Sequence, residues 1–213
     1  MTAYFADVRA LARKDLLLEL RARDTLPAML LFVLSTLVIF HFVLPGDSSE
    51  LAAKGLLWVA IVFTALLGLS RAFAAEREQG VIDGLVLAPS DRSAIWFGKA
   101  ISVLAFLGLA ELVALPAFGL FFGGVDGPMV AGVALADVGI AAVGTLTGAM
   151  AVAGRARELI LPLLFLPLAI PVVVGGVGAS AGAGPRYLGF LALYDVLFGL
   201  LAWAGFEYVV AET

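Results

Sequence analysis

The sequence predicts an all-α protein that crosses a membrane six times, with an interfacial helix at its N-terminus and both termini in the cytoplasm. Of its 213 residues, 62% are hydrophobic and 14% are charged, whereas apolar residues make up about half of an ordinary soluble domain. The apolar residues also come in runs of roughly 20, the length a helix needs to span a bilayer. Composition and run length together exclude a soluble domain and favour one transmembrane domain over residues 1–213.

The first 25 residues are too charged for a signal peptide or a span. Apolar residues from Phe5 to Leu16 recur at helical spacing, while Arg9 and Arg13 fall on another face. This pattern predicts an amphipathic helix over residues 3–23 that lies in the cytoplasmic interface and does not cross. A solvated helical tail is the alternative.

Six apolar runs follow, and each predicts one membrane-spanning helix. They cover residues 26–44, 55–74, 94–122, 128–153, 159–182 and 187–210. The separators between them are rich in glycine, proline, aspartate and serine, which favour turns. Pro116 predicts a bend in the third run. In the fifth run Pro162, Pro167 and Pro171 each remove a backbone donor, so we expect that helix to be broken or strongly bent.

Basic residues are distributed unequally between the two sides. Eleven of the thirteen Lys and Arg residues lie before the first run or beside the second and fourth connections, and only Lys54 and Arg186 lie on the other side. Because basic residues near span ends stay cytoplasmic, both termini and these two connections are predicted to be cytoplasmic. Glycines four apart, such as Gly144 and Gly148, favour a tight bundle and a contact with a second copy.

Residue types limit the chemistry that this chain can perform. It has no Cys, a single His and no phosphate-binding loop, so we expect no catalytic site, no metal site and no ATP hydrolysis within it. The net charge of −4 would argue against nucleic acid as a partner of a soluble protein, but in a membrane protein the placement of the charges matters more than their sum. We expect no nucleic acid partner. His41, near the outer end of the first run, could ligate haem iron or a metal, or it could be an ordinary interfacial side chain.

Three carboxylates lie inside apolar runs: Glu111, Asp137 and Asp195. A charged carboxylate facing lipid is costly, so such residues usually face the bundle interior or water and are functional candidates. A proton relay is one possibility. Hydrogen bonds to neighbouring Ser or Thr residues are the other.

A charged segment separates the second and third runs. Six of its residues form an acidic-basic pair, a glycine, an acidic residue two before a leucine, and a proline: Glu76, Arg77, Gly80, Asp83, Leu85 and Pro89. This order resembles the cytoplasmic coupling segment of type 2 ABC exporter permeases. The resemblance implies that residues 75–93 contact a separate ABC ATPase subunit. A solvated loop that anchors the topology is the alternative.

Over nearly its whole length the chain is similar to the haem exporter protein B family, the permease subunits of the ATP-dependent cytochrome c maturation system. The similarity is carried by ARKDLLLELRARDTL, by the second run with its charged segment, by LPLLFLPLAIPVVV and by FEYVVAET. It implies a bacterial inner-membrane permease with an ATPase subunit, a second copy of itself, a haem-handling membrane subunit and a haem chaperone as partners. Haem is then the expected cargo, with no tightly bound cofactor.

The sequence leaves open what such a permease moves. Haem itself could pass, or the bundle could push a haem-loaded chaperone off a neighbouring subunit. Arg186 or Lys54 would attract haem propionates while the carboxylates inside the runs would repel them, which favours the push. Two rival functions also remain: a generic exporter of lipid, polysaccharide or drug, and a carrier driven by protons without ATP.

Overall fold

The computed structural model describes residues 2–44, 50–78, 91–153 and 157–211. Every secondary-structure element within these ranges is a helix. The described helices are α1 (Thr2–Ala22), α2 (Thr25–Val43), α3 (Glu50–Glu78), α5 (Arg92–Phe122), α6 (Gly127–Ala153), α7 (Arg157–Ser180) and α8 (Gly184–Ala211). The all-α prediction is therefore confirmed for the described part of the chain.

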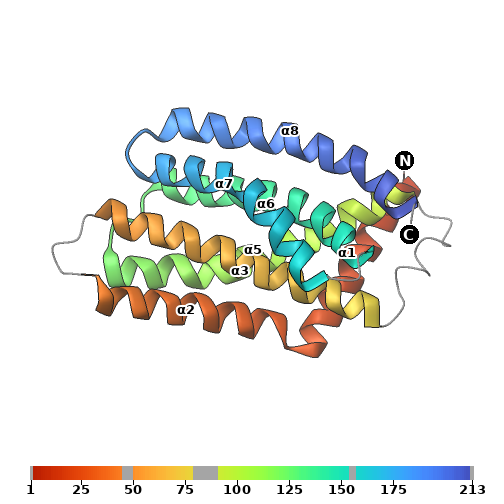
Figure 1. Cartoon of the computed structure of the whole chain (residues 1–213), viewed down its shortest axis with the longest axis horizontal. Coiled ribbons are helices and arrows are strands. Elements are labelled where there is room, and N and C mark those ends of the chain that lie inside the picture. Colours follow the sequence, from red (N-terminus) through yellow and green to blue (C-terminus); the bar gives the residue numbers. More distant parts are fainter. Residues whose placement is uncertain (1, 45–49, 79–90, 154–156, 212–213) are drawn as a thin grey trace.

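Six of these helices are long and apolar enough to cross a membrane, and α1 is not among them. Each of the six begins and ends within five residues of the run that predicts it. They run side by side, and α1 lies across one end of the bundle, where α8 also ends (Figure 1). We call this end the α1 end. That α1 and the last turn of α8 lie at the same end agrees with an even number of spans. That this end faces the cytoplasm stays a prediction from the distribution of basic residues.

Helix α6 forms the centre of the bundle and packs against α3, α5, α7 and α8. Of its span 67% is buried, against 17% of the spans of α2 and α8, which flank the bundle on opposite sides (Figure 1). The predicted close approach of helices occurs at Gly144 and Gly148, because a Cβ at either position would collide with Leu69 or Phe73 of α3. The missing side chains let α3 lie directly on α6.

The prolines do not interrupt the helices that carry them. Helix α7 is continuous through Pro162, Pro167 and Pro171, so of the two predicted alternatives, a broken or a strongly bent helix, the break is excluded. Helix α5 likewise continues past Pro116. A neighbouring helix supports this stretch: the Tyr194 hydroxyl of α8 donates to the carbonyl of Leu168 at 2.7 Å.

Helix α1 packs chiefly against α5. Val8 and Ala12 are buried in this contact, while Arg9 and Arg13 are exposed, as the amphipathic pattern predicts. Phe5 is 68% exposed, so the apolar face of α1 is only partly covered by the bundle. This arrangement suits a helix that lies at the membrane surface.

Candidate functional site

The predicted coupling segment leaves the bundle at the α1 end. Glu76 and Arg77 belong to the last turns of α3, whose apolar span ends at Phe73, close to the predicted end, and whose helix continues to Glu78. The two charged residues therefore extend a helix and do not stand in a loop. Nothing further of them, and nothing of Gly80, Asp83, Leu85 or Pro89, falls within the described residues. The structure does describe both points at which this segment joins the bundle.

The second of these points is the start of α5, which has a well-formed cap. Asp91 accepts hydrogen bonds from the backbone N–H of Ser93 at 2.9 Å and from its hydroxyl at 2.8 Å. These bonds lower the pKa of Asp91 from its ordinary value, because they stabilise the carboxylate. The Ser93 hydroxyl also shares a hydrogen bond with Tyr4 of α1 at 3.0 Å. The helix that receives the segment thus starts in a fixed position.

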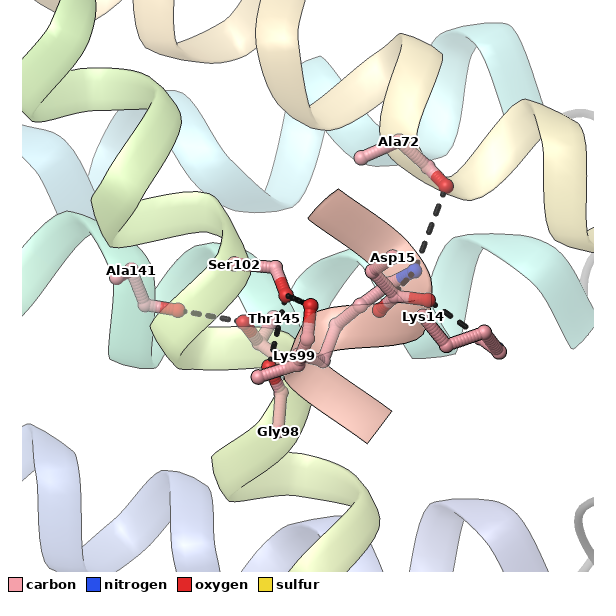
Figure 2. A network of polar contacts seen from close by, with 9 residues as sticks. Lys14, Asp15, Ala72, Gly98, Lys99, Ser102, Ala141 and Thr145 are labelled. Carbon is pink, nitrogen blue, oxygen red and sulfur yellow. Dashed lines mark hydrogen bonds and ion pairs between the residues drawn. The ribbon is translucent and has the colours of Figure 1, made fainter. Parts of the chain in front are cut away.

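Lys99 joins three helices at the α1 end (Figure 2). Its Nζ lies 3.3 Å from Asp15 Oδ2 of α1 and donates a long hydrogen bond of 3.5 Å to the carbonyl of Ala72 in α3. It also lies 5.0 Å from the centre of the Phe73 ring, within range of a cation–π interaction. We call these four residues the Lys99 joint.

The joint is shielded from solvent and carries a second cation. Lys99 is 6% exposed, and Lys14 Nζ lies 3.1 Å from the other carboxylate oxygen of Asp15. Two ammonium groups thus share one carboxylate. A buried charge needs such a partner, and removing the partner is strongly destabilising.

Close backbone packing holds α1 at this site. A Cβ at Gly98 would lie 2.7 Å from the Cβ of Leu11, so only glycine lets the two helices approach this closely. One turn further along α5, the Ser102 hydroxyl lies 3.2 Å from the carbonyl of Ala12 and 3.0 Å from that of Gly98. Helix α1 is therefore fastened to α5 by shape and by polar contacts.

Apart from Asp15, the residues of the Lys99 joint lie on the two helices that border the predicted coupling segment. Ala72 and Phe73 lie on the helix that runs into the coupling segment, and Lys99 lies on the helix that leaves it. Any displacement of the segment must act on both helices, and both are connected through one ammonium group. The Lys99 joint thus connects α1 with the two helices that border the predicted coupling segment.

The sequence did not single out this joint. The signal for Lys99 is that it is the one basic residue within the third apolar run. Asp15 is surrounded by other charges, and no local pattern distinguishes it. Their pairing is visible only once α1 is docked on α5.

Two of the three carboxylates inside the spans come together. Glu111 of α5 and Asp137 of α6 are 7% and 4% exposed, and their carboxyl groups lie within hydrogen-bonding contact of each other. Asp195 of α8 instead lies beside Gly139. Glu111 Oε1, Asp137 Oδ1 and both oxygens of Asp195 have no hydrogen-bond partner among the described residues, so the predicted bonds from Ser or Thr to these atoms are not found.

The two residues considered for haem contact, His41 and Arg186, do not come together at the end of the bundle opposite α1. His41 is exposed at the end of α2, with its ring 5.1 Å from that of Phe121 and 5.8 Å from that of Phe122. Arg186 is exposed at the start of α8, on the other side of the bundle from α2 (Figure 1). The structure therefore separates the two residues that were considered for haem contact.

Lys54, the other outer basic residue, is buried and already engaged. Its Nζ lies 2.7 Å from Glu50 Oε1 and donates to the carbonyl of Ser180 at 2.8 Å. The indole N–H of Trp58, which is fully buried, donates to the Ser180 hydroxyl at 3.2 Å. These contacts join the start of α3 to the end of α7. A haem propionate would have to compete with them, contrary to the expectation for this residue.

Comparison with known proteins gives a consistent result along the whole chain. A family model described as CcmB protein matches residues 6–206. The chain is 33% identical to Heme exporter protein B of Paracoccus denitrificans, over 96% of this chain and 97% of that protein. It is 30% identical to the protein of the same name from Bradyrhizobium diazoefficiens, over 90% of this chain and 88% of the other. With the protein of that name from Rhodobacter capsulatus the identity is 31%, over 79% and 80%.

Proposed function

Because the chain belongs to the CcmB protein family, we propose that it is the membrane permease of a bacterial haem exporter that serves the assembly of c-type cytochromes. It is a multi-pass protein of the bacterial inner membrane. The observation that carries the proposal is the near full-length similarity to relatives named Heme exporter protein B. This family membership also disfavours a generic exporter of lipid, polysaccharide or drug.

We propose that ATP is hydrolysed by a separate ABC ATPase subunit that binds residues 75–93. The Lys99 joint supports this role, because it connects α3 and α5, the helices on either side of that segment, to each other and to α1. An ATPase can shift the bundle between states only if it holds the segment differently in its two nucleotide states. Glu76, Arg77, Gly80, Asp83, Leu85 and Pro89 are the proposed contact residues.

Between haem passage and a mechanical push, we favour the push. His41 and Arg186 lie on helices at opposite sides of the bundle, and Lys54 is held by Glu50 and Ser180. Neither arrangement offers haem a ready site at the outer end. The proposed output is therefore a conformational change that acts on a neighbouring haem-handling subunit and releases its haem-loaded chaperone.

Two copies of the permease are proposed to work together. Each chain has one coupling segment, so two ATPase subunits would require two such segments, most simply related by a twofold axis. The sparsely buried spans of α2 and α8 provide apolar surfaces for neighbours in the membrane.

A deletion strain tests the proposed function. Membranes are examined by a haem-stained gel with no copy of the gene, with the wild type, with Arg77→Glu, and with Arg9→Glu as the control. Arg9 is an exposed basic residue of α1, so both variants reverse one charge at the same end. We expect the wild type and Arg9→Glu, but not Arg77→Glu, to restore covalently haem-labelled cytochromes. If the deletion strain retains its cytochromes, the haem assignment fails.

A second readout separates loss of coupling from loss of the permease. The Glu76→Ala, Arg77→Ala double variant should be present in membranes at the wild-type level but should no longer copurify with the ATPase subunit. Undiminished haem delivery by this variant would contradict the role of the segment, and the family assignment would be unaffected.

A further inference from the structure

Glu111 and Asp137 form an unusual contact in the middle of the bundle. One projects from α5 and the other from α6, they are 7% and 4% exposed, and their carboxyl groups are within hydrogen-bonding contact. Within the described ranges, no ion pair links either carboxyl to a basic side chain. Among the residues that the structure describes, the pair therefore has no cation to balance it.

The chemistry of carboxyl groups limits what this contact can be. An ionised carboxylate only accepts hydrogen bonds, whereas a protonated carboxyl group also donates one. Two carboxyl groups can therefore be hydrogen-bonded to each other only if at least one proton lies between them. Without that proton, two negative charges would be in contact in a medium of low dielectric constant, where their repulsion is large.

A small cavity adjoins Glu111, and none of its lining residues belongs to α6. It has a volume of about 10 Å³ and is lined by residues of α2, α3 and α5, of which only Thr64 and Glu111 are polar. Thr64 is 4% exposed, and its hydroxyl and Glu111 Oε1 both lack a hydrogen-bond partner within the described part of the chain. A cavity of this size accommodates one water molecule, and such waters bind between unpaired polar groups.

We propose that Glu111 and Asp137 form a binding site for one shared proton, which Thr64 completes through a single bound water molecule. The site does not depend on the proposed function and does not require that protons are transported. The bound proton leaves one negative charge on the pair instead of two and joins α5 to α6 at mid-bundle. Asp195 is not part of the site, because it lies beside Gly139 on the α8 side of α6.

Infrared spectroscopy tests the shared proton. The purified full-length protein is studied at neutral pH in H₂O and D₂O, and the isotope-sensitive C=O band of protonated carboxyl groups is measured for the wild type, Glu111→Gln, Asp137→Asn and the double variant. Either amide can donate to the remaining carboxylate in place of the proton. We expect each single variant to lose the same band intensity and the double variant to lose no more.

Other infrared outcomes overturn the proposal. Additive losses in the double variant would mean that each carboxyl carries its own proton, so none is shared. An unchanged band in both single variants would mean that the pair is ionised. Asp195→Asn is the matched control, because it replaces another carboxyl group within a span that lies outside the pair, so the change in band intensity that it causes should add to that of Glu111→Gln.

The sign of a stability change tests the role of Thr64. Thr64→Val keeps the shape of the side chain and removes the hydroxyl. If the hydroxyl binds a water molecule that also bonds Glu111, the variant should lower Tm by about 2–4 °C, the shift for one lost hydrogen bond in a chain of this size. An unchanged or raised Tm would overturn the water contact. Thr145→Val is the control, because the Thr145 hydroxyl bonds only within its own helix, to the carbonyl of Ala141 at 2.7 Å.

Discussion

Lys99 of α5 and Asp15 of α1 form an ion pair, with Nζ and Oδ2 3.3 Å apart and side chains that are 7% and 12% exposed. The same ammonium group contacts the Ala72 carbonyl of α3. An exposed ion pair contributes little to stability, whereas breaking a buried one leaves an unbalanced charge. The pair therefore stabilises the docking of α1 beside the helices that border the predicted coupling segment.

Removing the cation should undock α1. We expect Lys99→Met to lower the free energy of unfolding by roughly 3 kcal/mol, since Asp15 would keep a buried charge with one partner fewer. Lys14→Met is the matched control, because it removes the cation on the other oxygen of Asp15. The Lys14 side chain is 33% exposed, so the effect of this substitution should be smaller. Denaturation of the purified protein in detergent measures both.

A double-mutant cycle then isolates the pair. Asp15→Asn combined with Lys99→Met should cost less than the sum of the two single substitutions, because no unbalanced charge remains. Strictly additive effects would contradict a direct interaction between the two side chains.

Adding one methyl group to α5 should separate it from α1. At Gly98 the new Cβ would lie 2.7 Å from Leu11 Cβ, and such overpacking costs about 1–3 kcal/mol. At Gly108 of the same helix no atom lies within 4 Å of the added Cβ, and alanine favours a helix by up to about 1 kcal/mol over glycine. Gly98→Ala should thus lower Tm and Gly108→Ala should leave it unchanged or raise it. Equal Tm shifts would show that the contact with Leu11 is unimportant.

The cap of α5 predicts a pH dependence. Asp91→Ala should lower the free energy of unfolding by about 1 kcal/mol at neutral pH. The hydrogen bonds from Ser93 lower the pKa of Asp91 in the folded protein, so the ionised cap stabilises the fold above the unfolded pKa of about 3.9 and loses this effect as the pH falls through the lower folded value. The difference between wild type and Asp91→Ala should be constant from about pH 5 to 8 and should shrink below about pH 4.

A serine at this position separates capping from charge. Asp91→Ser retains a side-chain acceptor for the N–H groups of α5 but does not titrate. Its stability should stay near that of the wild type at neutral pH, and it should lack the acid-dependent loss. An identical acid profile for both proteins would mean that other carboxylates cause it.

The outer contact between α3 and α7 should depend on one hydroxyl. Ser180→Ala leaves the indole N–H of fully buried Trp58 without its partner, which costs about 1–3 kcal/mol. Thr36→Ala on α2 is the comparison, because its exposed hydroxyl bonds only to the Phe32 carbonyl of its own helix. Thermal unfolding followed by tryptophan fluorescence should show a lower Tm for the first variant only.

The helices could be predicted from the sequence because a helix that crosses lipid must be apolar along its length. A span must be apolar for roughly 20 residues, so the six runs locate α2, α3 and α5 to α8 to within a few residues. The amphipathic pattern locates α1 in the same way. The apolar run locates the span of α3, which ends at Phe73, but not the end of its helix, because a helix can leave the membrane and continue through charged residues, here to Glu78.

The partners of individual side chains could not be predicted. Glu111, Asp137 and Asp195 carry the same sequence signal, yet only the first two meet, because α5 and α6 face each other there. The pairing of Asp15 with Lys99 depends on the docking of α1 against Gly98, a contact between segments far apart in the chain. The coupling residues from Glu76 to Pro89 stay a prediction.

The docking of α1 also constrains the order of events during synthesis. Its hydrogen bonds to α5 join residues 89 and 90 positions apart, which corresponds to roughly 5–18 s of translation at about 5–20 residues per second. Helix α1 is synthesised before α5, so it cannot form these contacts until the third span has been made. Closing this distant contact completes the α1 end only in chains whose first three spans have entered the bilayer correctly.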